Sequence, residues 1–303
     1  MNERIRFIPR LKRGRIIPLI LLVSLCCSAQ KSAEFFTVSY SSASKSRFGD
    51  GGRAGLDVLD MNLITPTIDI GENTKLNNIF AYKLLDYELP AEAGEARNYP
   101  GKLHDIQYAL LIRQKLDKQW NLMFVPQFIV RSNFKSNFGT RDLFPALAVI
   151  AMRKSRNHEG LEWGYGASYS RDFTKNTFTP LFAISYLSSR YRVDMVLPVK
   201  AQFVLTPSKT FEYGIEANLE TGIYNIGTKN DFGWQYTRTM NVPVGMTAAA
   251  EIYGMLWVKA KVGMQFLREY DFLDRSYSVV KNQEGTIEAS AYASLGISLR
   301  LKE

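Results

Sequence analysis

Cysteine and histidine are nearly absent from this sequence, which contains two residues of each among 303. Both cysteines, Cys26 and Cys27, lie near the start of the chain. Residues 30–303 therefore offer no disulfide, no thiol nucleophile and no cysteine ligand for a metal. Two histidines are also too few for a histidine-rich metal centre. We accordingly expect neither a metal site nor a cofactor.

Long apolar runs are missing as well. After residue 29, no stretch reaches about 18 consecutive apolar residues, the usual minimum for a transmembrane helix. No linker rich in proline, glycine or serine interrupts residues 30–303. These absences predict a single domain over residues 30–303, with no membrane helix inside it.

The first 29 residues differ from the rest in composition. Six basic residues precede an apolar run at 16–27, and Cys27-Ser28-Ala29 offers small residues for cleavage. This order predicts a secretory signal peptide at residues 1–29, because an apolar run of about twelve residues is too short for a membrane helix of around 20. A lipoprotein signal is the alternative, and Leu25 argues against it because a small residue is expected there.

The net positive charge comes mostly from this segment. The whole chain has 38 basic and 29 acidic residues. Residues 1–29 hold six of the basic and one of the acidic residues, which leaves 32 and 28. A nucleic-acid-binding domain carries a strongly basic face, so we expect no nucleic-acid partner.

Residues 288–301 show the clearest pattern in the chain. Alternate positions are apolar without a break, whereas the others are mainly polar or small. This period predicts a β-strand long enough to cross a bilayer, for which roughly 9 to 11 tilted residues suffice. Four positions resemble the C-terminal signal that the bacterial barrel-assembly machinery reads, with leucine in place of the usual terminal aromatic: Ser294, Gly296, Leu299 and Leu301.

The same alternation recurs along much of residues 35–301. It is clear at 103–116, 119–132, 191–205 and 255–269, where one face is apolar and the other carries charges. A soluble β-sandwich is the alternative, but charges of both signs on the second face and aromatics near strand ends are typical of a membrane barrel. We predict an all-β fold, a transmembrane antiparallel up-and-down β-barrel, closed because an open sheet edge in lipid would leave backbone groups unpaired.

The number of strands in such a barrel is expected to be even. The sequence shows thirteen alternating segments, and this count places the long connection 88–102 on the side of the short turns. Either a strand has been split or merged between about 150 and 230, or residues 35–42 lie outside the barrel. The prediction is about 12 strands, with 14 as the alternative.

Three stretches carry a resemblance to a known family. They are LHDIQYALLIRQKLDKQWNLMFVPQFIVRSNF (103–134), GYGASYSRDF (164–173) and TPLFAISYLSSRYRVDMVLPVKAQF (179–203). They resemble an uncharacterised family of outer-membrane β-barrels found in Bacteroidota, and the likeness extends through most of residues 30–303. The resemblance implies a barrel in the outer membrane. It implies no activity and no catalytic residue.

The first class of function is a narrow pore for small solutes. Rings of charged side chains set selectivity in such pores, and a basic excess would favour anions. The alternative is that the charges pair with one another and close the lumen. The candidate lumen-lining residues are Arg113, Lys115, Arg131, Arg192, Asp194, Lys200, Glu216, Lys259, Lys261 and Arg300.

Two other classes are a structural or binding barrel and an outer-membrane enzyme that acts on lipid or surface substrates. A binding barrel would work through its loops, which are expected at 88–102, 225–234 and 270–285. An enzyme would need a base that activates a nucleophile. His104 beside Asp105 is the candidate base, but no serine lies at a recognisable spacing from it. We expect no enzyme. The expected partners are outer-membrane lipid and lipopolysaccharide, and the barrel-assembly machinery during biogenesis.

Overall fold

The computed structural model describes residues 32–49, 51–90, 101–172, 176–227, 234–280 and 285–302. The signal peptide predicted at residues 1–29 lies outside these ranges. The described residues form one 3₁₀ turn, Thr140–Asp142, and seventeen strands. The strands are β1 Ser32–Arg47, β2 Arg53–Ile64, β3 Ile68–Ile70, β4 Thr74–Glu88, β5 Lys102–Lys115, β6 Trp120–Ser132, β7 Ala146–Lys154, β8 Leu161–Ser170, β9 Thr177–Leu187, β10 Tyr191–Leu197, β11 Lys200–Ser208, β12 Phe211–Asn218, β13 Glu220–Asn225, β14 Tyr236–Tyr253, β15 Leu256–Leu273, β16 Thr286–Ile287 and β17 Ser290–Lys302.

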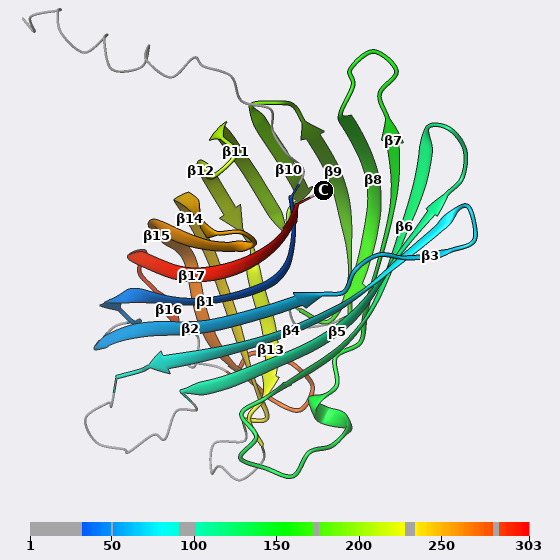
Figure 1. The fold of residues 1–303 in the computed structure, drawn as a ribbon. Coiled ribbons are helices and arrows are strands. Elements are labelled where there is room, and N and C mark those ends of the chain that lie inside the picture. Colours follow the sequence, from blue (N-terminus) through cyan, green and yellow to red (C-terminus); the bar gives the residue numbers. More distant parts are fainter. Residues whose placement is uncertain are drawn as a thin grey trace, which may run out of the picture.

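Fourteen of these strands close into one antiparallel ring (Figure 1). The order around the ring is β1, β2, β4 to β12, β14, β15 and β17, and β17 pairs with β1 to close it. A closed ring leaves no edge strand, so backbone groups at membrane depth can all pair. The other three strands among the described residues, β3, β13 and β16, are short. None of the described residues forms a helix that is long and apolar enough to cross a membrane.

The prediction of about 12 strands is wrong, and the alternative of 14 is right. Residues 191–205, expected as one strand, are the two strands β10 and β11, joined by a turn at Pro198 and Val199. Val196 pairs with Lys200 across this turn, and two residues four apart also share one face of a single strand. The turn therefore leaves the alternation of the sequence unbroken, which is why the pattern did not reveal it.

The additional strand also corrects the placement of the loops. The first strand begins and the last strand ends at the same end of the barrel, where the connections are short, such as the turn at Asp117. The backbone N–H groups of Trp120 and Gln119 donate to its carboxylate at 2.7 and 2.6 Å and lower the pKa of that carboxyl. The longer connections from β4 to β5, β6 to β7 and β15 to β16 lie at the other end. This asymmetry is typical of outer-membrane barrels.

The alternation predicted for the last strand is confirmed in β17. Leu295 and Ile297 face outward with 63 and 47 % of their surface exposed, whereas Ser298 and Arg300 are buried inside the ring. Phe128 on β6 is likewise exposed on the outer surface. An apolar outer face with a polar interior suits a barrel that meets lipid. The closed ring also excludes the β-sandwich alternative.

One segment leaves the wall of the barrel. The alternating segment at residues 210–224 divides at Leu219 into two strands. β12 stays between β11 and β14, whereas β13 pairs with β14 on one edge and meets β6 on the other, where Asn225 pairs in parallel with Ser132. The backbone N–H of Asn133 donates to the Asn225 carbonyl at 3.0 Å. Because β6 and β14 lie far apart in the ring of fourteen, β13 crosses the barrel interior (Figure 1).

β14 and β15 bend to accompany β13. The register between β14 and β15 shifts between Met240 and Val242 of β14. Leu267, on β15 opposite this shift, has a φ of 46°. A bulge of this kind bends a strand and increases its twist. Nine strands consequently form a smaller ring at the end with the long connections: β1, β2, β4, β5, β6, β13, β14, β15 and β17. In a closed ring of antiparallel strands the directions alternate, so an odd number of strands leaves one neighbouring pair parallel. The β6–β13 pair is this parallel contact.

The smaller ring has an apolar centre. Leu85 and Leu103 pack there against Tyr224 of β13 and against Tyr270 and Phe272 of β15, and all five side chains are buried. Close-packed apolar side chains leave little room for water. An aqueous path through the barrel therefore has to pass beside this apolar cluster.

We expect the protein in detergent to migrate faster on a gel when unheated than when boiled, with a β-rich far-UV circular dichroism spectrum, because a closed barrel resists unfolding. Gly296→Val should reduce the fast form, because a Cβ there would lie 2.7 Å from the Ser39 Cβ across the β1–β17 seam. Ala293→Val adds the same side chain on the exposed outer face and should change nothing. Equal amounts of the fast form in both variants would contradict this account of the seam.

Candidate functional site

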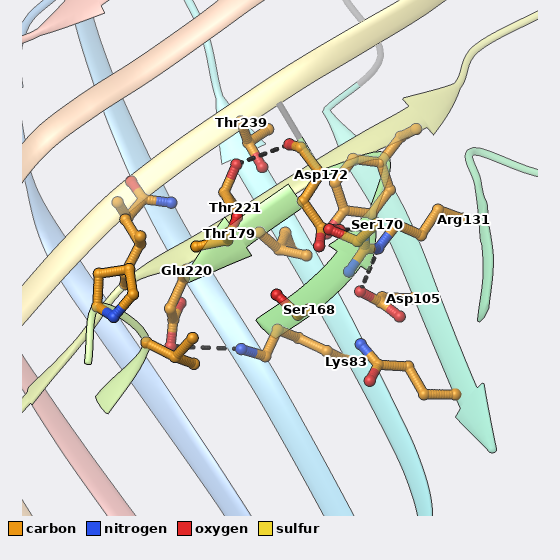
Figure 2. A pocket seen from close by; sticks show the side chains of 17 residues that line it. Lys83, Asp105, Arg131, Ser168, Ser170, Asp172, Thr179, Glu220, Thr221 and Thr239 are labelled. Atoms are coloured by element: carbon orange, nitrogen blue, oxygen red, sulfur yellow. Dashed lines mark hydrogen bonds and ion pairs between the residues drawn. The ribbon is translucent and has the colours of Figure 1, made fainter. Parts of the chain in front are cut away.

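The barrel interior contains a cavity of about 260 Å³ beside β13, next to Leu85 and Tyr224 of the apolar cluster. Figure 2 shows it between β13 and side chains that point inward from the opposite wall. Charged, hydroxyl and amide side chains make up most of its lining: Lys83, Asp105, Arg131, Asp172, Glu220, Gln107, Ser168, Ser170, Thr179, Thr221, Thr239 and Asn241.

Arg131 of β6 is buried beside this cavity, with 5 % of its surface exposed. Its Nε donates to Asp105 Oδ2 at 2.7 Å, and its Nη1 donates to Asp172, which follows β8. The guanidinium also lies over the ring of Tyr224, 5.9 Å from the ring centre. Removing one partner of a buried ion pair is strongly destabilising. Two carboxylates and one aromatic ring therefore hold Arg131 in a single position.

β13 is attached to the surrounding wall by ion pairs and hydrogen bonds. Lys83 of β4 lies 3.3 Å from Glu220 of β13 and 3.4 Å from Asp60 of β2. Thr221 Oγ1 donates to the backbone carbonyl of Asp172 at 2.9 Å. These contacts join β13 to β4 and to the segment after β8, so the strand has a defined place inside the barrel.

A glycine allows β13 to pass close to Arg131. A Cβ at Gly222 would lie 3.2 Å from Arg131 Cζ and 3.1 Å from Tyr224 Cε2. Both separations are tighter than ordinary contacts, so a larger side chain would displace the guanidinium. Glycine inside a strand often marks such a close approach.

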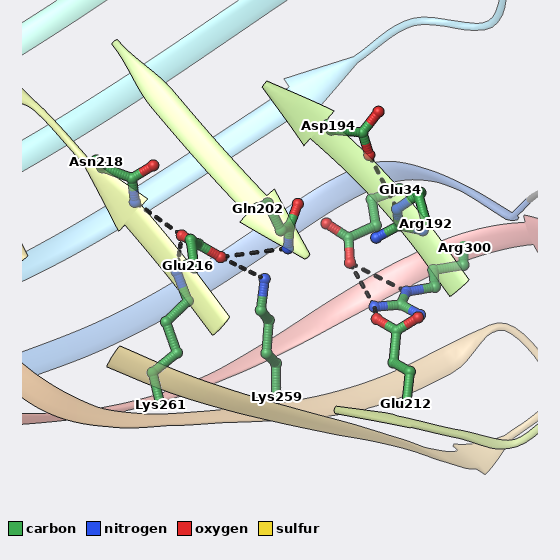
Figure 3. Close-up of polar contacts among 10 residues, drawn as sticks. All are labelled: Glu34, Arg192, Asp194, Gln202, Glu212, Glu216, Asn218, Lys259, Lys261 and Arg300. Atoms are coloured by element: carbon green, nitrogen blue, oxygen red, sulfur yellow. Dashed lines mark hydrogen bonds and ion pairs between the residues drawn. The ribbon is translucent and has the colours of Figure 1, made fainter. Parts of the chain in front are cut away.

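A second group of charges lies nearer the short turns (Figure 3). Glu216 of β12 lies 2.6 Å from Lys261 and 3.4 Å from Lys259, both on β15. It also accepts hydrogen bonds from Asn218 Nδ2 at 2.8 Å and Gln202 Nε2 at 3.4 Å. Two cations and two amides thus surround one buried carboxylate.

Arg300 forms a third group, next to the β1–β17 seam. Its Nη2 donates to Glu34 at 2.6 Å and to Glu212 at 2.7 Å. The guanidinium lies over the ring of Trp257, 4.2 Å from the ring centre. Figure 3 shows the two carboxylates on either side of the guanidinium. These contacts connect the strands at the seam with β12 and β15.

The ten predicted lining residues fall into two sets. Arg113, Lys115 and Lys200 are exposed. The other seven form ion pairs with one another or with further carboxylates, as in the 3.0 Å contact between Arg192 Nε and Asp194 Oδ2. These seven are Arg131, Arg192, Asp194, Glu216, Lys259, Lys261 and Arg300. When the further carboxylates Asp105, Asp172, Glu34 and Glu212 are counted, five cations face six carboxylates, so little net charge remains.

The sequence analysis missed several residues of the site. Lys83 lies on the inward face of its strand, two positions from the buried Leu85. The alternation of that strand could therefore have identified Lys83 as a lining residue. Glu34 precedes the segment expected as the first strand. Glu220 and Tyr224 carried no such signal, because they belong to a strand that leaves the wall.

The candidate catalytic pair and the candidate assembly signal from the sequence can also be placed in the structure. His104 is on the outer phase, where its Nδ1 lies 2.9 Å from the Tyr82 hydroxyl, whereas Asp105 faces the cavity. The described residues contain no group of three or more histidine, cysteine or acidic side chains that could hold a metal ion. Ser294, Gly296 and Leu299 lie in β17, and the assembly signal that they form with Leu301 stays a prediction.

Comparison with known proteins yields one family match. Residues 67–300 match the family described as a domain of unknown function (DUF6268). None of the curated proteins matches the sequence. The chain is similar in structure to the COG4313 outer membrane channel from Pseudomonas putida F1, at 12 % identity and a TM-score of 0.42, over 90 % of this chain and 97 % of that one.

Two further solved structures are less similar. The translocator domain of autotransporter NalP from Neisseria meningitidis has 10 % identity and a TM-score of 0.37, over 89 % of each chain. LpxR from Salmonella typhimurium has 8 % identity and a TM-score of 0.36, over 87 % of this chain and 99 % of that one. At these values the likenesses carry no argument about function.

We expect Glu216→Gln to lower the free energy of unfolding by about 3 kcal/mol, because it leaves Lys259 and Lys261 without their carboxylate in the barrel interior. Urea unfolding in lipid vesicles, followed by tryptophan fluorescence, measures this loss. Glu162→Gln is the matched control, because Glu162 lies 3.9 Å from Lys154 in an exposed pair, which contributes less than about 1 kcal/mol. Equal losses in the two variants would contradict a special role for the Glu216 group.

Proposed function

The chain belongs to the family described as a domain of unknown function (DUF6268), and from its geometry we propose that it is an outer-membrane channel with a narrow path for small polar solutes. The path runs through the cavity beside β13, because close-packed apolar side chains fill the neighbouring centre of the smaller ring. The observation that carries the proposal is this polar cavity inside a closed ring. A polar interior is typical of barrels that admit water.

The location and the partners form part of the same proposal. A signal peptide at residues 1–29 directs export, and the barrel-assembly machinery inserts the chain by reading the signal in β17. The apolar outer face then contacts outer-membrane lipid and lipopolysaccharide. The resemblance to barrels of Bacteroidota suggests the source of the protein.

The charges along the path suggest which solutes pass. Exposed Arg113, Lys115 and Lys200 attract anions where they meet water. The cavity instead has three carboxylates and two cations: Asp105, Asp172, Glu220, Lys83 and Arg131. Anion preference is therefore weak, and the size of the solute matters more than its charge.

We expect the purified protein to give discrete conductance steps in a planar lipid bilayer. The steps should be smaller than those of an open barrel of the same strand number, because β13 occupies part of the lumen. Boiled protein, in which the barrel is unfolded, is the control. A folded protein that stays silent at all voltages would contradict the channel.

A second measurement asks whether the path passes the cavity. Glu220→Gln should shift the reversal potential in a salt gradient toward anions, because the cavity loses one carboxylate while Lys83 and Arg131 remain. Glu159→Gln, in the exposed turn after β7, is the matched control and should leave the reversal potential unchanged. If the two variants behave alike, ions take another route.

The second candidate function is a closed barrel that binds partners through its loops. The apolar cluster in the smaller ring favours it, because this cluster already closes part of the interior. The paired charges of the lumen are compatible with it too, since side chains can fill a narrow barrel. Absence of conductance would favour this function over the channel.

A further inference from the structure

We propose that the cavity beside β13 binds a neutral, hydroxyl-rich solute of about the size of a monosaccharide. The inference rests on the proposed function, because the solute reaches the cavity through the lumen. It adds the chemical class of the solute and names the side chains that recognise it.

Two side chains of the cavity lining have incomplete hydrogen bonding. Among the described residues that line the cavity, Asp105 and Asn241 each have a side-chain oxygen without a hydrogen-bond partner. Their exposed fractions are 4 and 1 %. The second oxygen of Asp105 accepts from Arg131, and the Asn241 amide donates to the Tyr87 hydroxyl at 3.1 Å. Buried polar atoms are rarely left unpaired. Both oxygens have almost no accessible surface, so a side-chain rotation has to bring each of them to a hydrogen-bond donor in the cavity.

These two acceptors come from different walls of the cavity. Asp105 lies on β5, and Asn241 lies on the part of β14 that pairs with β13. Hydroxyl groups of Ser168, Ser170 and Thr179 line the cavity from β8 and β9. A ligand with several hydroxyl groups can donate to the acceptors and also accept from these side chains. The lining therefore favours a polyhydroxylated molecule.

The charges of the cavity argue against an ionic ligand. Arg131 already pairs with Asp105 and Asp172, and Lys83 already pairs with Glu220. An anion would have to displace these carboxylates, and a cation would have to displace the arginine or the lysine. A neutral ligand leaves both ion pairs intact. The volume of about 260 Å³ lies just below the range of about 300 to 1,000 Å³ of sites for drug-sized ligands, so the ligand is small.

Three sugars with the same ring separate these possibilities. Equilibrium dialysis measures the binding of D-glucose, positively charged D-glucosamine and negatively charged D-glucuronate to the folded barrel in detergent. Block of the ion current by each sugar is recorded in parallel in planar bilayers. We expect saturable binding of glucose that is at least about tenfold tighter than that of either charged sugar.

The variants test the side chains. Asn241→Leu removes one acceptor at similar volume and should weaken glucose binding by about tenfold. Thr247→Val is the matched control, because its buried hydroxyl also has no partner in the described structure but does not line the cavity. Thr179→Val, which removes a hydroxyl from the wall, replaces Asn241→Leu if heat-modifiability shows that the latter does not fold.

Several outcomes would overturn the inference. Without saturable glucose binding, water alone occupies the cavity. Tighter binding of glucosamine or glucuronate would make charge the basis of recognition, and equal losses in Asn241→Leu and Thr247→Val would place the binding elsewhere. A protein that conducts ions without binding glucose refutes this inference and keeps the channel. One that binds glucose without conducting supports the site and overturns the channel.

Discussion

Backbone hydrogen bonding inside lipid is the constraint on which the rest of this structure depends. Each unpaired backbone group in hydrocarbon is costly, so the sheet has to close on itself. The pairing of β1 with β17 achieves this closure, and the close approach at Gly296 is part of that seam. β12 keeps its place between β11 and β14, so β13 can leave the wall while the ring of fourteen strands stays closed.

The departure of β13 brings side chains of different chemistry together in the barrel interior. Apolar side chains from the wall, from β13 and from β15 form a packed cluster. Mostly polar side chains line the neighbouring cavity, which also touches Leu85 and Tyr224 of that cluster. Asn225 joins the strand to β6 at one end, and the polar residues before it join the strand to β4 and to the segment after β8. The position of β13 thus shapes both the packed cluster and the cavity.

The ion pairs of the interior specify geometry more than they add stability. A buried ion pair gains Coulomb energy but loses the hydration of both charges, so its net contribution is small. Breaking the pair is costly, however, because one charge is then left alone. Arg131 and Glu216 each sit between two opposite charges, and this arrangement fixes the strands that carry them relative to one another. A rigid polar interior of this kind can discriminate among solutes by their hydrogen-bonding groups.

The sequence by itself determined the barrel, the face of each long strand that meets lipid, and the inward placement of residues such as Arg131 and Arg300. These follow from a period of two, which is local and which a membrane enforces on both faces. The period of two did not reveal the tight turn at Pro198, because this turn preserves the period. The strand number was therefore underestimated. Only the tertiary structure decided that β13 leaves the wall and that Glu220 and Tyr224 meet Lys83 and Arg131. Such contacts join residues far apart in the chain, and their energy depends on the partners that closure of the ring brings together, which no local pattern encodes.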